Sequence, residues 1–316
     1  AAIESSLNTG LYLSLCVAEY LNVHRGFSSF IAFLAISLSI FWVISLSTFS
    51  SSKSIGVQHW RGNKATVVFA RVLFCSSLRL KFIKEEFGGK IDLLIYSLAS
   101  GMRTDPKDGV TYRSALKSTK GEIVGPSINI EKDAMEETTM GVATPEEIHS
   151  TVKVMGGEDW KLWVDALDEA GVLTDGFKTV AYSYLGPKVT YGIYKDGTIG
   201  AAKRDLEHTS DVLNDFLKKK YNGEAYVSLS KALMTKASAV IPIFPLYAAL
   251  LYRVMKEKGI HEGTIQQKHR LLKDMVYGDK PEIDDQRRLR PDNWEMREDV
   301  QAEVEALWDQ VTPENF

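Results

Sequence analysis

Cysteine is scarce in this chain of 316 residues, which contains only Cys16 and Cys75. Two cysteines cannot form a disulfide framework, so the sequence gives no sign of a secreted, disulfide-stabilised fold. Histidine and cysteine clusters with zinc-ligand spacing are also lacking. His261-Glu262 begins like a zinc-binding helix, but no histidine follows four residues after His261. We therefore expect no metal site.

A strong excess of one charge is lacking as well. The formal net charge is -3, with 38 Lys and Arg against 41 Asp and Glu, which argues against nucleic acid as a partner. Hydrophobic residues make up 45% of the chain, enough to form the core of one large domain or two modest ones.

Acidic residues are almost missing from the first 80 positions, where only Glu4 and Glu19 occur. Residues 26–52 carry no charge, and an apolar run of about 20 residues can span a bilayer. Residues 27–50 are therefore a candidate membrane span. Two other interpretations stay open: a buried helix pair, or a mis-translated region that comes from a shifted reading frame or a retained intron.

From Lys81 onward the sequence is rich in Asp, Glu and Lys, as soluble enzymes are. We therefore divide the chain into an atypical apolar, Ser-rich segment, 1–80, and a domain, 81–316. The segment 1–80 offers no Gly-rich phosphate loop, because its glycines are scattered at positions 10, 26, 56 and 62.

Alternating strands and helices are predicted in the domain. The pattern gives buried strands at 91–96, 178–184 and 225–229, a hairpin-like excursion at 101–142, a capping box at Thr144–Glu147, and helices at 159–169 and from Thr198 to Tyr221. This alternation predicts an α/β fold: a doubly wound, Rossmann-like, mostly parallel sheet with helices on both faces.

Tyr194 and Lys203 are the most informative pair of residues. A phenol can hand a proton to a substrate, and a nearby ammonium can favour the ionised phenol and hold a cofactor ribose. On one continuous helix this spacing would place the two side chains on opposite faces. The turn signal Asp196-Gly197 and a candidate N-cap at Thr198 instead predict Tyr194 on a loop and Lys203 on the next helix, facing one crevice.

Three more residues are expected near this crevice. Ligands of doubly wound sheets bind beyond the carboxyl ends of the strands. Leu98, Tyr184 and Thr235 each follow a predicted strand, so we expect them to converge at that edge of the sheet.

Four stretches around the tyrosine–lysine pair carry a family resemblance. They are VMGGEDW at 154–160, TVAYSYLGP at 179–187, ASAVIP at 237–242 and MKEKGIHEG at 255–263. In this order they resemble the single-chain, NADH-dependent trans-2-enoyl-CoA / enoyl-acyl-carrier-protein reductase family, whose members are enlarged relatives of the short-chain dehydrogenases. The likeness runs from about Lys81 to Phe316.

The resemblance implies roles for individual residues. Tyr194 matches the catalytic proton donor, Lys203 a cofactor-binding lysine and Tyr184 a substrate-side tyrosine. The other cofactor-binding matches are Leu98 and Ala99 along the cofactor, and Leu233, Met234 and Thr235 near the nicotinamide.

The resemblance also implies a reaction: NADH-dependent reduction of the 2,3-double bond of a trans-2-enoyl-CoA or enoyl-acyl-carrier-protein thioester, in fatty acid synthesis. It implies a monomer with added substrate-side helices, in the cytoplasm, or in the mitochondrion of a eukaryote. On this interpretation 81–316 is an enoyl reductase catalytic domain, truncated at both ends. The competing interpretation is a non-catalytic fragment, or a membrane-tethered remnant, that lacks a complete cofactor site.

Overall fold

The computed structural model describes residues 67–70, 83–85, 88–97, 100–235 and 238–316. The candidate membrane span at 27–50 lies outside these ranges, as do the predicted cofactor residues Leu98 and Ala99. Among the helices within the ranges, none combines the length and the apolar character needed to cross a bilayer.

A five-stranded sheet is the framework of the main unit, Lys53–His261 with Pro281–Phe316. Its strands lie in the order β1-β2-β7-β8-β9, and each is parallel to its neighbours. Their bounds are β1 Val67–Ala70, β2 Ile91–Tyr96, β7 Leu173–Ser183, β8 Glu224–Leu229 and β9 Arg288–Leu289. Parallel strands joined through helices are what the sequence predicted, and the α/β, Rossmann-like fold class is confirmed.

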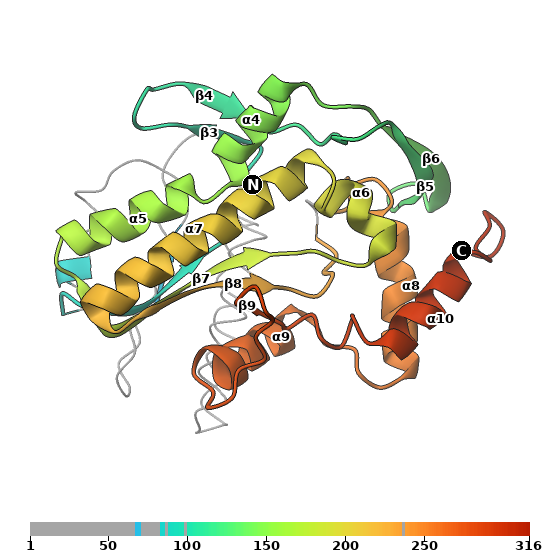
Figure 1. The fold of residues 1–316 in the computed structure, drawn as a ribbon. Helices are drawn as coiled ribbons and strands as arrows, with labels where there is room; N and C mark the ends of the chain where they lie inside the picture. Colours follow the sequence, from blue (N-terminus) through green and yellow to red (C-terminus); the bar gives the residue numbers. More distant parts are fainter. Residues whose placement is uncertain (1–66, 71–82, 86–87, 98–99, 236–237) are drawn as a thin grey trace, which may run out of the picture. The chain divides into compact units, whose positions relative to one another are not determined.

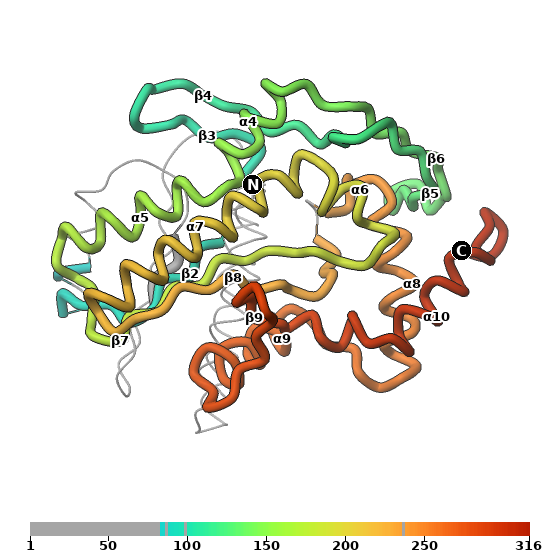
Figure 2. The backbone as a smooth tube through the Cα atoms, in the orientation of Figure 1, coloured from blue at the N-terminus to red at the C-terminus, as the bar shows by residue number. Residues whose placement is uncertain are grey.

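Helices α5 (Glu158–Glu169) and α7 (Thr198–Tyr221) lie together over one face of this sheet (Figures 1 and 2). An apolar stripe of α5 is buried there: Trp160, Val164 and Leu167 are at most 1% exposed. The indole N–H of Trp160 donates a hydrogen bond to Thr179 Oγ1 on β7, at 2.9 Å. The helix is therefore fixed to the sheet by packing and by one buried polar contact.

Helix α4 (Pro145–Met155) begins at the predicted capping box. The Thr144 hydroxyl accepts from the backbone N–H of Glu147, and the Glu147 carboxylate accepts from the N–H of Thr144. Gly157 separates α4 from α5, and a Cβ there would collide with the Thr209 side chain on α7. The glycine thus lets the α4–α5 junction lie against α7.

Two antiparallel hairpins form the predicted excursion between β2 and α4. They are β3 (Met102–Thr104) with β4 (Thr111–Arg113), and β5 (Ile123–Asn129) with β6 (Ala134–Met140).

A second apolar core lies apart from the one between the sheet and its helices. It includes residues of α6 (Tyr191–Tyr194), α8 (Phe244–Glu257) and α10 (Glu298–Trp308). Figure 1 shows α8 and α10 beside each other, next to the end of the ribbon that leaves β7. These are the added helices that the family resemblance implied.

The segment Glu262–Lys280 belongs to a separate compact unit. It contains helix α9 (Thr264–Arg270) and the π-helix η2 (Leu271–Val276). Within it, Arg270 forms an ion pair with Glu262 at 2.5 Å.

Three details differ from the sequence predictions. Strand β1 lies within 1–80, where no cofactor-binding strand was recognised. Strand β7 begins at Leu173 rather than Lys178. Gly197 is the N-cap of α7 in place of Thr198, whose hydroxyl instead donates to the Ala115 carbonyl oxygen. The boundary near residue 80 stays a prediction.

Candidate active site

Tyr194 is the last residue of α6, so its predicted place on a loop was wrong. The short 3-10 helix η1 (Lys188–Thr190) leads directly into α6, and Asp196 N–H donates back to the Tyr191 carbonyl at 2.7 Å. The predicted turn then follows. At Gly197 a Cβ would collide with the carbonyl oxygen of Ile193, so only glycine fits between α6 and α7. This turn separates Tyr194 from the helix that carries Lys203.

Two aromatic rings pack against the ring of Tyr194. Tyr194 lies edge-to-face with Tyr184, with centroids 4.6 Å apart and an interplanar angle of 84°. Phe244 of α8 packs against both tyrosines, at 5.8 Å from Tyr184 and 5.9 Å from Tyr194. Tyr194 is only 6% exposed, and burial raises its pKa above the usual value near 10. The phenol is therefore protonated at neutral pH and able to donate.

The Tyr194 hydroxyl accepts from and donates to none of the residues that the structure describes. The ring of Tyr194 is buried, but its hydroxyl oxygen is not among the buried side-chain atoms that lack a hydrogen bond. Its hydroxyl is thus available to a substrate oxygen or carbon.

Lys203 points from α7 to the end of β7. Its ammonium donates to Ser183 Oγ at 3.0 Å, and Ser183 immediately precedes Tyr184. Burial lowers the pKa of Lys203 to about 8, while the Glu207 carboxylate one turn away acts to raise it. The structure thus brings Tyr184, Tyr194 and Lys203 together around the carboxyl end of one strand.

The segment after β8 carries Leu233, Met234 and Thr235. The Met234 N–H donates to the Tyr252 hydroxyl at 2.7 Å, and the Thr235 N–H donates to Ser238 Oγ at 2.8 Å. Met234 packs in the same apolar core as Tyr194. The cofactor-binding roles of these three residues stay predictions.

Glu295 was missed by the sequence analysis. It precedes α10, is fully buried, and accepts hydrogen bonds from the hydroxyls of Tyr184 at 3.0 Å and Tyr247 at 2.7 Å. The N–H of Ala232 donates to its other oxygen at 2.6 Å. Burial raises the pKa of Glu295 to about 7, against the lowering effect of these donors. No local signal distinguishes this glutamate from its many charged neighbours in the sequence.

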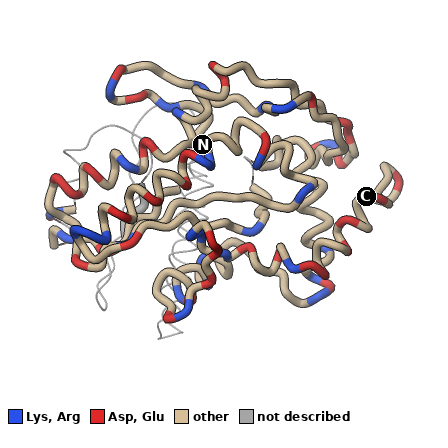
Figure 3. Tube along the Cα trace, viewed as in Figure 1, with Lys and Arg blue, Asp and Glu red and all other residues tan. Residues whose placement is uncertain are grey.

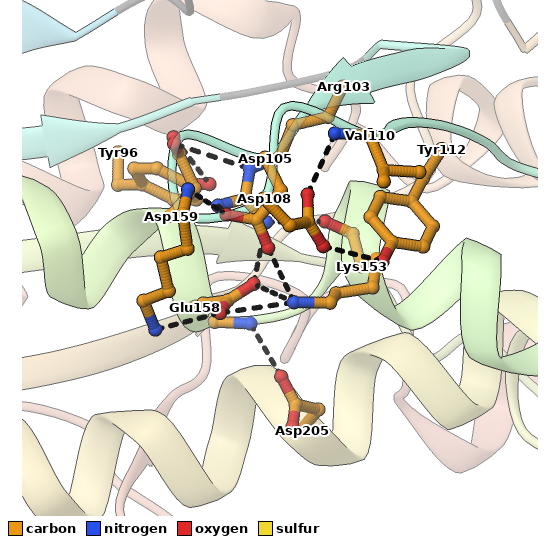
Figure 4. Close-up of polar contacts among 12 residues, drawn as sticks. Tyr96, Arg103, Asp105, Asp108, Val110, Tyr112, Lys153, Glu158, Asp159 and Asp205 are labelled. Carbon is orange, nitrogen blue, oxygen red and sulfur yellow. Dashed lines mark hydrogen bonds and ion pairs between the residues drawn. The ribbon is translucent and has the colours of Figure 1, made fainter.

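A cluster of buried charges joins hairpin β3–β4 to the α4–α5 junction (Figure 4). Arg103 pairs with Glu158 at 2.9 Å and with Asp159 at 3.5 Å. Lys153 pairs with Asp105 at 2.5 Å and with Glu158 at 2.9 Å. Glu158 and Asp159 occupy the first turn of α5, and they also hold this cluster together. Its charges neutralise one another, so we assign it a structural role.

Acidic and basic residues are interspersed along the described chain, as Figure 3 shows. Within the described ranges, no group of three or more His, Cys, Asp or Glu residues is arranged to hold a metal ion.

A parallel α/β sheet that brings a buried tyrosine and a lysine to the end of one strand is typical of dinucleotide-dependent oxidoreductases. The family model described as trans-2-enoyl-CoA reductase catalytic region matches residues 73–277, and one described as enoyl reductase FAD binding domain matches 283–316. The chain belongs to the trans-2-enoyl-CoA reductase family.

Curated relatives agree with this assignment. An enoyl-[acyl-carrier-protein] reductase [NADH] of Photobacterium profundum is 48% identical over 86% of this chain and 72% of its own length. A trans-2-enoyl-CoA reductase [NADH] of Clostridium beijerinckii is 54% identical over 75% of this chain and 60% of its own. The first match is too long to fit within 81–316 alone, so it extends into the segment 1–80.

Solved structures agree as well. The NADH complex of the Clostridium acetobutylicum trans-2-enoyl-CoA reductase has a TM-score of 0.74 and 48% identity, over 76% of this chain and 60% of that protein. The Treponema denticola trans-2-enoyl-CoA reductase with NAD has a TM-score of 0.72 and 45% identity. The chain thus spans about three fifths of the length of these two structures.

Proposed function

We propose that this protein uses NADH to reduce the 2,3-double bond of a trans-2-enoyl thioester, carried by CoA or acyl-carrier protein, in fatty acid synthesis. One observation carries the proposal: the protonated hydroxyl of Tyr194, which has no hydrogen-bond partner among the described residues, belongs to a buried ring that lies against Tyr184, at the strand end where Lys203 is anchored. Membership of the reductase family supports the choice of reaction.

Tyr194 acts as the acid in this mechanism. When bound, NADH supplies the hydride that goes to the β-carbon of the substrate. Negative charge then develops on the thioester oxygen, where a preorganised donor such as the Tyr194 hydroxyl is most effective. Tyr194 supplies the proton that balances the hydride, and the saturated thioester leaves. Tyr184 lines the substrate side, and its contact with Tyr194 fixes the position of the donor.

Lys203 fits the ribose of a dinucleotide. It is partly buried, and Ser183 is the acceptor for only one of its three donor hydrogens. A polyhydroxyl ligand would satisfy the remaining donors. At neutral pH the ammonium is largely charged, so it also favours the phenolate that Tyr194 becomes after donation. We also assign five other residues to the cofactor side: Leu98, Ala99, Leu233, Met234 and Thr235.

We further propose that the protein is a monomer, located in the cytoplasm or, in a eukaryote, in the mitochondrion.

Replacement of Tyr194 by phenylalanine tests the proposal. Tyr194→Phe keeps the ring packing but removes the donor, so crotonyl-CoA reduction should fall by about 10²–10³-fold. The melting temperature should change little, because the hydroxyl has no partner among the described residues. Turnover is measured by the loss of NADH absorbance, and unfolding by circular dichroism.

Tyr191→Phe is the matched control. Tyr191 lies on the same helix, one turn earlier, and its ring contacts the Lys195 ammonium rather than Tyr184. The control should retain wild-type turnover. If Tyr194→Phe stays within a factor of about three of the wild type, Tyr194 is not the proton donor.

A further inference from the structure

Glu295 is a buried carboxylate that the proposed reaction does not use directly. Two tyrosine hydroxyls meet at its Oε1, from Tyr184 at 3.0 Å and Tyr247 at 2.7 Å, and the Ala232 N–H meets its Oε2 at 2.6 Å. A backbone N–H can only donate, and three donors around one carboxyl group match its ionised form, which only accepts. Charge-assisted hydrogen bonds of this kind are among the strong ones.

These contacts connect Glu295 to both sides of the candidate active site. Tyr184 is the ring that packs edge-to-face on Tyr194. Ala232 immediately precedes the segment Leu233–Thr235, which we assign to the cofactor side. One carboxylate therefore holds the partner of the proton donor and the start of the segment that faces the cofactor.

On the basis of the proposed function, we propose that Glu295 is a positioning residue, which sets the direction of the Tyr184 hydroxyl and fixes the segment after Ala232 for reaction at Tyr194. A phenol has one hydrogen to donate. Because Tyr184 donates it to Glu295, its oxygen presents only lone pairs in other directions. Tyr184 then accepts hydrogen bonds on the substrate side and does not compete with Tyr194 as an acid.

Protonation of Glu295 would reverse this arrangement. A neutral carboxyl group has its own hydrogen to place, so one of the tyrosine hydroxyls would lose its acceptor and turn. The charged and titratable groups around Glu295 are Tyr184, Tyr247, Tyr194, Tyr252 and Asp292. Burial raises the pKa of Glu295 to about 7, so the ionised form is present above that pH and lost below it.

Glu295→Gln is the first test. Glutamine has the same size, but its amide nitrogen would meet either the Ala232 N–H or the tyrosine hydroxyls, so one buried donor loses its acceptor. We expect kcat for crotonyl-CoA to fall by about tenfold or more, a factor that one unsatisfied buried group can supply. We also expect the wild-type decline in kcat/KM below about pH 7 to be absent from the variant.

Glu298→Gln is the matched control, because Glu298 is an exposed residue at the start of α10, the helix that follows Glu295. It should keep the wild-type rate and pH profile. Glu295→Gln with unchanged kcat, KM and pH profile would overturn the proposal.

A second measurement is independent of turnover. In protein labelled with 13C at the tyrosine ζ-carbons, the Tyr184 signal is assigned by its loss in Tyr184→Phe. We expect this signal to shift with a midpoint near pH 7 in the wild type and to lose that transition in Glu295→Gln. An inactive wild type that shows the transition would refute the proposed function but support the coupling of Glu295 to Tyr184. A wild type without the transition would overturn the role of Glu295, including the case in which Glu295→Gln fails to fold.

Discussion

At the scale of single residues, the site depends on how three polar groups are satisfied. Tyr194 has no described partner, Lys203 has one, and Glu295 has three donors. Donors with spare hydrogens inside a largely buried site are suited to bind a ligand, because a hydrogen bond to the ligand would satisfy them. Glu295 is already satisfied, and it is therefore suited to hold its neighbours in place.

The sequence could predict the tyrosine and the lysine but not the glutamate. Tyr194 and Lys203 are separated by a recognisable turn, so the local pattern could single them out as candidates. Glu295 reaches Tyr184 across 111 positions of the chain, and only the packing of the second core brings them together. A contact made over such a distance leaves no local pattern to detect.

Removal of the Lys203 ammonium should weaken cofactor binding and turnover together. Lys203→Ala loses charge-assisted hydrogen bonds worth about 1.5–3 kcal/mol each, so the Kd for NADH should rise by at least about tenfold. Lys203→Arg should not restore full function, since a planar guanidinium does not replace a compact ammonium. Binding is measured by titration calorimetry.

Lys219→Ala serves as the control, because Lys219 is exposed on the same helix. For the wild type we expect NADH affinity to decline as the pH rises through about 8, where the Lys203 ammonium loses its proton. Unchanged NADH affinity in Lys203→Ala would show that this lysine does not contact the cofactor.

At the scale of elements, long segments with clear periodicity were predicted correctly from the sequence, and short segments were not. The helix α5 and the capping box of α4 were predicted and observed. Helix α6 has only four residues and β9 only two, which is too short to show any period. Tyr194 was placed on a loop for this reason.

The charge cluster of hairpin β3–β4 gives a prediction at this scale. The Arg103 side chain is 1% exposed and faces carboxylates of Glu158 and Asp159. Arg103→Met would leave the Asp159 carboxylate without this counter-ion, while Glu158 would keep its pairs with Lys153 and Lys107. Breaking a buried pair in this way costs about 3–5 kcal/mol. Urea denaturation followed by circular dichroism should show a loss of stability of this size.

Lys107→Met provides the comparison. Lys107 also pairs with Glu158, at 3.0 Å, but its side chain is 62% exposed. Exposed ion pairs contribute at most about 1 kcal/mol, so this variant should remain close to the wild type. Equal effects of the two substitutions would contradict a role for burial in this cluster.

At the scale of the whole molecule, we can name candidate residues for the nicotinamide half of a dinucleotide site. For the pyrophosphate half, the sequence of 1–80 offers no recognisable loop. The lysine and the tyrosines that we propose for the nicotinamide half lie at the end of β7. A pyrophosphate requires backbone N–H groups at a helix N-terminus, which are reached closely only past glycine. In the segment 1–80 the glycines stand at 10, 26, 56 and 62, a spacing that predicts no such loop.

The difference between the two halves of the site can be measured by comparing NADH with reduced nicotinamide mononucleotide, which lacks the adenosine half. If 1–80 provides no pyrophosphate site, NADH should bind this chain no more than about tenfold more tightly than the mononucleotide, a difference of roughly 1.4 kcal/mol. The mononucleotide should also support crotonyl-CoA reduction, because the residues assigned to the reaction all lie after residue 80. Fluorescence titration of both ligands measures the ratio.

Lys203→Ala identifies where the two ligands bind, since it should weaken both by the same factor if they share the ribose contact. A preference for NADH of about a hundredfold or more would correspond to roughly 3 kcal/mol gained from the adenosine half. That result would mean that the segment containing β1 builds a pyrophosphate site without the usual glycines. Because β1 already pairs with β2 in the sheet, the ratio of the two affinities decides whether this segment extends the fold alone or also completes the cofactor site.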